Sequence, residues 1–176
     1  MVFGDKNTYA IEVYHQPLYN SEFYMSGKMC IHLFNKSFGD IDNEYCQVFM
    51  AYGTLLEKIN NIDLLKYDFS QNNDHDIFTF LDDKLYMCDD KRTLVQIKRD
   101  AELYFKFNFM TNSGGETFDD SKSFIYMDKN EKMHIMYQKY NEKDKIICNE
   151  LDKEIFENVT NEFIKWYEGI EIKNKK

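Results

Sequence analysis

Alternating apolar and polar side chains indicate two strands near the start of the chain. Every second residue is apolar in Thr8–Tyr14, and the same holds in Lys28–Phe34. The alternating positions are Tyr9, Ile11 and Val13 in the first segment and Met29, Ile31 and Leu33 in the second. Because successive side chains of a strand point to opposite faces, this period of two predicts two strands with one apolar face each.

Two longer segments instead have the 3.6-residue period of an amphipathic helix. The first covers residues 45–59, with Asp42 or Asn43 as its candidate N-cap. The second covers residues 151–167, with Asn149 as candidate cap and Gly169 just past its end. The apolar stripes are Tyr45, Val48, Phe49, Tyr52, Leu55, Leu56 and Ile59 in the first, and Ile155, Phe156, Val159, Phe163, Trp166 and Tyr167 in the second.

The segments between these helices are predicted to be mainly strands. Residues 77–81 and 84–88 look like a hairpin closed at Asp82-Asp83, and residues 123–127 and 132–137 like a second hairpin. Two further strand-like segments and a loop around Gly114-Gly115 complete the pattern; they are Thr93–Ile97, Tyr104–Met110 and Thr111–Ser121.

Consecutive strands with only two clear helices favour an α+β fold over alternating βαβ units. The 176 residues, 43% of them hydrophobic, are enough to bury one core without a metal or a disulfide. The single proline, Pro17, and seven scattered glycines give no linker and no repeat. The sequence therefore predicts one domain over residues 1–176, with an antiparallel sheet and the two amphipathic helices packed on it.

Cysteine spacing and the apolar runs bear on where the protein acts. The four cysteines form no CxxC pair and are expected to be reduced thiols. The N-terminus lacks the basic-then-apolar pattern of a signal peptide, and the apolar helical run Tyr45–Leu56 is short of the roughly 20 residues of a membrane span. A cytoplasmic location without a membrane partner is expected.

No segment carries a recognisable catalytic or metal-binding motif. The four histidines lack HExxH spacing, and no serine sits in a nucleophile elbow. Asp74-His75-Asp76 resembles an acid/base set, but a solvated loop is the favoured interpretation. Cys148 could gain thiolate character at the start of the last helix, although a buried structural thiol is favoured. We therefore predict no catalytic residue, no metal and no cofactor; an enzyme with a dispersed site stays open.

The net charge of −9 argues against a nucleic-acid partner and suits a basic protein partner, although acidity also serves solubility. Acidic side chains gather in the middle of the chain, interrupted by Lys91 and Arg92, while a further pair, Asp119-Asp120, lies later. They are either solvated turns or a rim that steers a basic partner. The predicted contact residues are Asp74, Asp76, Asp82, Asp83, Asp89 and Asp90.

Three segments carry a resemblance to a known family. The opening Met1–Glu12 has an apolar pair, Gly-Asp and an aromatic-Ala-Ile run; Gly27–Ile31 and the pair Gly39-Asp40 follow. A weaker likeness spans Gly115–Asp119 and Phe124–Tyr126. These residues resemble the family called Immunity protein 42, with Lys6 standing where that family often has proline.

The resemblance implies a cytoplasmic antidote of a bacterial polymorphic toxin or contact-dependent inhibition system. Such a protein would bind the C-terminal toxic domain of its cognate toxin. Immunity families share no active site, so the resemblance assigns no residue a role. The alternatives are an acidic adaptor domain that binds another protein and an enzyme with a dispersed site.

Overall fold

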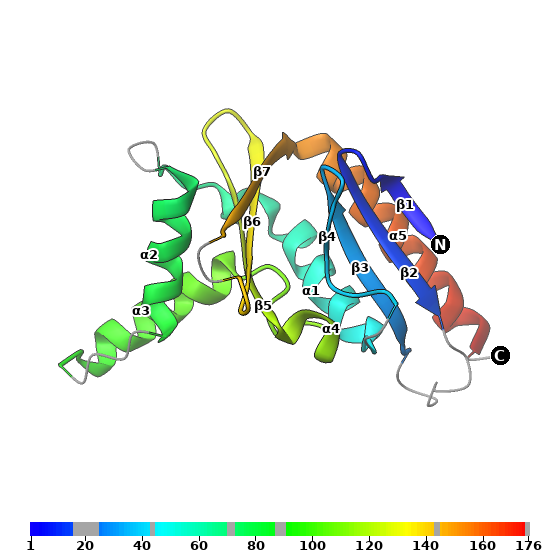
Figure 1. Ribbon diagram of the computed structural model, residues 1–176, viewed down its shortest axis with the longest axis horizontal. Coiled ribbons are helices and arrows are strands. Elements are labelled where there is room, and N and C mark those ends of the chain that lie inside the picture. The colour runs from blue at the N-terminus through cyan, green and yellow to red at the C-terminus, as the bar shows by residue number, and fades with distance from the viewer. Residues whose placement is uncertain (16–24, 43–44, 70–72, 87–90, 143–144, 175–176) are drawn as a thin grey trace.

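The computed structural model describes residues 1–15, 25–42, 45–69, 73–86, 91–142 and 145–174, and its strands form two antiparallel sheets (Figure 1). The N-terminal sheet has the order β1 (Val2–Asp5), β2 (Tyr9–His15), β3 (Gly27–Leu33) and β4 (Lys36–Phe38). The central sheet has the order β5 (Ser121–Met127), β6 (Lys132–Lys139) and β7 (Ile147–Asp152). The predicted α+β class is confirmed, as are both N-terminal strands and the β5–β6 hairpin, but the structure has two sheets instead of one.

Five α-helices and one 3₁₀ helix accompany the described strands. They are α1 (Val48–Asn60), η2 (Ile62–Leu65), α2 (Asp74–Tyr86), α3 (Leu94–Phe107), α4 (Glu116–Asp119) and α5 (Lys153–Asn174). Both predicted amphipathic helices exist as α1 and α5, although three details were wrong. Gln47, not Asp42, precedes α1, Asn149 lies in β7, and Gly169 lies inside α5.

The predicted hairpin at residues 77–88 is wrong, because Asp74–Tyr86 is the helix α2 and Asp82-Asp83 lies inside it. Asn73 caps this helix: its Oδ1 accepts the backbone N–H of Asp76 at 3.0 Å, and its Nδ2 donates to the Asp76 carboxylate at 2.8 Å. The Asn73 side chain thus satisfies one backbone N–H of the first turn, as an N-cap residue does, and marks the start of a helix.

The predicted strands at residues 93–97 and 104–110 are also wrong, because α3 occupies most of both. Thr93 and Gln96 form a capping box, in which the Thr93 Oγ1 accepts the Gln96 N–H at 3.3 Å and the Gln96 Oε1 accepts the Thr93 N–H at 2.8 Å. Thr-x-x-Gln is a helix-start signal that strand-like alternation in this segment obscured. The loop predicted at residues 111–121 contains the short helix α4.

The central sheet is buried on both faces and so joins two apolar clusters. Ile125 and Ile135 face the larger cluster, which also receives side chains from the N-terminal sheet, α1 and α5. Phe124 and Met136 face the smaller cluster, under α2 and α3. Figure 1 shows the result: α2 and α3, here called the α2–α3 arm, cover one side of the central sheet, and α1 and the N-terminal sheet lie on the other.

Candidate functional site

The outer face of α3 carries large apolar side chains that the rest of the described chain leaves uncovered. Leu94 is 85% exposed, Ile97 44% and Phe105 62%. With the half-buried Ala101 between them, these residues are spaced by three or four positions and therefore share one side of the helix. Tyr104 and Phe107 of the same helix are instead buried in the smaller cluster. We call the exposed row Leu94, Ile97, Ala101 and Phe105 the α3 stripe.

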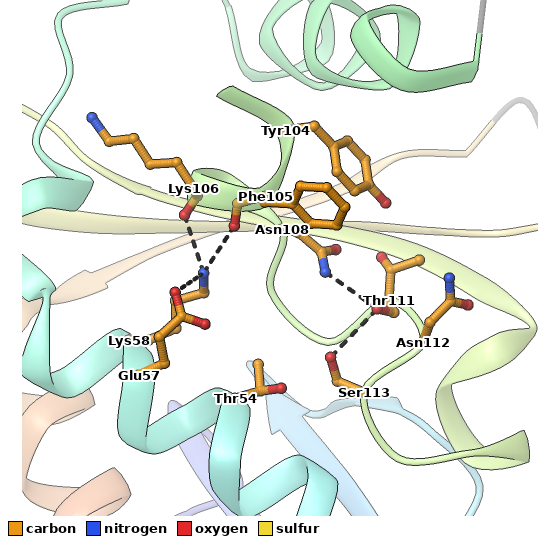
Figure 2. Close-up of a pocket in the computed structure, with 10 residues that line it drawn as sticks. All are labelled: Thr54, Glu57, Lys58, Tyr104, Phe105, Lys106, Asn108, Thr111, Asn112 and Ser113. Atoms are coloured by element: carbon orange, nitrogen blue, oxygen red, sulfur yellow. Dashed lines mark hydrogen bonds and ion pairs between the residues drawn. The ribbon is translucent and has the colours of Figure 1, made fainter. Parts of the chain in front are cut away.

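The α3 stripe ends at a cavity of about 500 Å³ between α1, the end of α3 and residues 108–113. Figure 2 shows Glu57 and Lys58 on α1 facing the last turn of α3 across this cavity, while the ammonium of Lys106 points away from it. Phe105 belongs both to the stripe and to the lining of the cavity. The exposed ring of Phe105 therefore lies at the edge of a cavity that is lined largely by polar residues.

Lys58 fixes the end of α3 to α1. Its side chain is almost fully buried, and its Nζ donates to the carbonyl oxygens of Phe105 at 3.2 Å and Lys106 at 3.1 Å (Figure 2). These carbonyls belong to the last turn of a helix, where intrahelical donors are missing and the dipole favours a cation. Burial lowers the pKa of Lys58, while the carboxylate of Glu57, 3.6 Å away, opposes that shift.

Residues 108–113 supply the polar side of the cavity. The Asn108 side chain donates to the Thr111 carbonyl at 3.2 Å, and the Ser113 hydroxyl donates to the same oxygen at 3.4 Å (Figure 2). Asn112 has a φ of 60°, a left-handed conformation that asparagine tolerates. The cavity thus offers amide and hydroxyl groups beside an aromatic ring, a combination suited to holding a side chain of another protein.

Two of the six predicted acidic residues face the central sheet. The Asp74 carboxylate accepts a hydrogen bond from the Tyr126 hydroxyl at 2.9 Å and lies 3.3 Å from His134 Nδ1. The hydrogen bond from His134, helped by that of Tyr126, lowers the pKa of Asp74 against the effect of burial. Asp82 forms an ion pair with Lys122 at 2.5 Å.

Two other predicted residues, Asp76 and Asp83, lie on the exposed outer side of α2. They are seven positions apart and therefore on one face of the helix, with the partly exposed Phe80 between them. Asp89 and Asp90 lie outside the described residues. The Asp119-Asp120 pair lies at the end of α4, and burial, with Glu116 and Asp120 nearby, raises the pKa of Asp119.

The sequence pattern that defines Immunity protein 42 matches residues 1–166. The chain belongs to this family. Membership confirms the resemblance seen in the sequence and the prediction of a toxin-neutralising immunity protein.

A solved structure has the same fold as this immunity protein. CdiI from Burkholderia dolosa AUO158 superimposes with a TM-score of 0.68 at 12% identity, over 94% of this chain and 99% of the other. At that identity the likeness establishes a shared fold. No curated protein matches the sequence.

The chemistry considered from sequence is arranged differently in the folded immunity protein. Asp74-His75-Asp76 begins α2 instead of forming a loop, and Asp74 pairs with the distant His134, which no spacing in the sequence signals. Cys148 lies in β7, and burial, with a further contribution from Asp74, raises the pKa of its thiol to about 11. Activation of Cys148 by a helix terminus is therefore wrong. Cys30, Cys46 and Cys148 are free thiols, and Cys88 lies outside the described residues.

None of the helices in the described part of the chain is both long enough and apolar enough to cross a bilayer.

Proposed function

We propose that this immunity protein binds the C-terminal toxic domain of one cognate toxin and blocks it in a stoichiometric complex, in the cytoplasm of the cell that makes both. The family supports this proposal, and the fold shared with CdiI favours a contact-dependent inhibition or polymorphic toxin system. The protein acts as a binding inhibitor and not as an enzyme, without a nucleic-acid or membrane partner.

The observation that carries the choice of surface is the α3 stripe. Leu94 and Ile97 are exposed at one end of the stripe, and Phe105 is exposed at the other, beside the cavity. Interfaces are enriched in aromatic residues, and a few well-packed residues supply most of the binding free energy. We propose that the toxic domain covers the stripe and inserts a side chain into the cavity, where Phe105 is the main apolar contact.

The acidic residues take a second role in this proposal. Asp76 and Asp83 face solvent on α2, so their carboxylates can attract a basic toxin domain before contact. Asp89 and Asp90 lie outside the described residues and stay proposed contact residues on the grounds of charge alone. Asp74 and Asp82 are proposed to act indirectly, because their pairs with His134 and Lys122 fix the position of α2.

The test is a binding measurement with purified protein and an inactive variant of the toxic domain. We expect Ile97→Glu and Phe105→Ala each to weaken the complex at least tenfold, because truncation of a hot-spot residue costs about 2 kcal/mol or more and about 1.4 kcal/mol is already tenfold in affinity. Tyr14→Ala is the matched control. Tyr14 is an aromatic residue with 58% exposure, and it belongs to β2 of the N-terminal sheet and not to the α2–α3 arm. Wild-type affinity in both arm variants would reject the surface, and no complex with the unaltered protein would reject the function.

A further inference from the structure

We propose that Glu12, Cys30 and His32 form a binding site for one divalent cation of the zinc class. The site lies on the face of the N-terminal sheet opposite the apolar core, away from the α2–α3 arm. It goes beyond the proposed toxin binding and does not depend on it.

The strand register brings the three residues together. Glu12 on β2 is directly opposite Cys30 on β3, and His32 follows Cys30 by two positions, so all three side chains leave the same face of the sheet. The core residues Ile11, Ile31 and Leu33 occupy the other face. A Cys-x-His pair on one strand with a carboxylate on its neighbour therefore forms a compact donor set, although the sequence separates its members by up to 20 positions.

The donor atoms already face one another. His32 Nε2 is 2.7 Å from Glu12 Oε2 and 3.3 Å from Cys30 Sγ, and one ligand atom from each residue lies within 4.8 Å of the others. Around a tetrahedral zinc ion, such donors are separated by about 3.4 to 3.6 Å, given zinc bonds of about 2.0 to 2.3 Å. The nitrogen and carboxylate oxygen must therefore move apart by less than about 1 Å, which rotation of the partly exposed Glu12 side chain allows.

The types of donor select the class of ion. A thiolate with an imidazole favours zinc and similar transition metals over calcium or magnesium, which prefer oxygen ligands. Cys30 is 1% exposed, while the side chains of His32 and Glu12 are 14% and 23% exposed. An ion can therefore enter past the carboxylate and imidazole, and water can complete its coordination.

Lys6 competes with the ion for Glu12. Its ammonium forms an ion pair with Glu12 Oε2, the same oxygen that accepts from His32. This pair satisfies the carboxylate when no metal is bound, so the proposed ion is not required for folding. Replacing Lys6 removes a cation that the metal must displace, and should therefore strengthen metal binding.

Binding of Zn²⁺ and Co²⁺ to the full chain, measured by competition with a chromogenic chelator, tests the site. We expect one ion per chain, with thiolate-to-cobalt charge-transfer absorption in the Co²⁺ form. Glu12→Gln should weaken binding tenfold or more, as the loss of even an outer-shell partner does, and Lys6→Gln should strengthen it. Cys30→Ser should abolish the charge-transfer band, whereas Cys148→Ser, the matched thiol control, should keep it.

If Cys30→Ser fails to fold, the variants Glu12→Gln and Lys6→Gln still test the metal site. Both side chains are partly exposed, so these variants should fold. Their opposite effects on metal affinity follow only from a site at Glu12. Binding that is absent in the unaltered chain, unaffected by Glu12→Gln, or lost in Cys148→Ser instead of Cys30→Ser would overturn the proposal.

Discussion

Lys58 is a buried cation whose hydrogen bonds go to the two carbonyl oxygens at the end of α3. We predict that Lys58→Met lowers the free energy of unfolding by about 1 to 3 kcal/mol, because buried acceptors are left without a donor. Urea denaturation measures the change. Glu57→Gln is the control; the Glu57 carboxylate is 59% exposed, and its loss should cost about 1 kcal/mol or less. Equal effects of the two substitutions would contradict the capping role of Lys58.

The pair of His134 and Asp74 makes stability depend on pH. Burial lowers the pKa of His134, but the hydrogen bond and charge of Asp74, with Glu150 and Asp128, outweigh burial and raise the pKa above its usual 6.5. A group whose pKa is raised by folding stabilises the protein below its unfolded pKa, and the contribution is lost as pH rises through the folded pKa. Asp74 behaves in the opposite sense: its lowered pKa gives stability above pH 3.8 that is lost on acidification.

We therefore predict that His134→Gln costs most stability at mildly acidic pH and progressively less as the pH rises above 6.5. Thermal or urea unfolding of both proteins across this range measures the difference. His75→Gln, which replaces an exposed histidine on α2, is the matched control for the substitution itself. A difference between His134→Gln and the unaltered protein that stays constant with pH would contradict the pairing with Asp74.

At the level of elements, α3 depends on the capping box at its start. Thr93→Ala should lower the free energy of unfolding by about 1 kcal/mol, since the Oγ1 that accepts the Gln96 N–H is lost. Thr79→Ala, an exposed threonine inside α2 whose hydroxyl donates to the His75 carbonyl, is the matched control and should have a smaller effect. Chemical denaturation distinguishes the two; a larger loss for Thr79→Ala would show that the cap is not formed.

Periodicity in the sequence predicted the elements that bury one face and expose the other. β2, β3, α1 and α5 belong to this class, and each was found. The helix α3 was missed because its outer face is also apolar, which hides the helical period. Phe105, Phe107 and Phe109 alternate like a strand, yet Phe105 is exposed on α3, Phe107 is buried under it and Phe109 follows it beside β5.

The candidate site was less predictable than the fold, because its parts come from separate elements. The acidic residues were visible as a group, but sequence did not separate the exposed Asp76 and Asp83 from Asp74 and Asp82, whose partners lie about 40 to 60 positions away. By sequence Lys58 is one of the polar positions of α1, which are expected to face solvent. It is buried because its ammonium binds the carbonyl oxygens at the end of α3, a contact that sequence does not reveal. The Thr93-x-x-Gln96 box and the Asn73 cap were the local signals for the helices of the arm, and strand-like alternation obscured both.

At the scale of the whole molecule, two apolar clusters share the central sheet. One domain over residues 1–176 stays a prediction, and a single cooperative unfolding transition would test it.

The net charge of −9 should speed association with a basic toxin domain. We predict that the association rate falls as salt rises, because the Debye length shrinks from about 10 Å at 0.1 M to about 3 Å at 1 M. Stopped-flow mixing measures this rate.

Asp83→Asn should lower the association rate and leave the dissociation rate nearly unchanged, because a carboxylate at the rim acts mainly before contact. Glu168→Gln on α5, an acidic residue far from the arm in the sequence, controls for the change in net charge alone. An association rate that ignores salt would contradict the steering role of the acidic residues while leaving the complex itself in place.

Co-expression with the cognate toxic domain tests the central claim most directly. Bacteria that make the toxic domain together with the unaltered immunity protein should survive, and the two chains should be recovered as one stable complex. The Ile97→Glu variant, present at the same level, should protect poorly, and Tyr14→Ala should protect fully. Death of the cells despite abundant unaltered protein, with no complex recovered, would contradict the account.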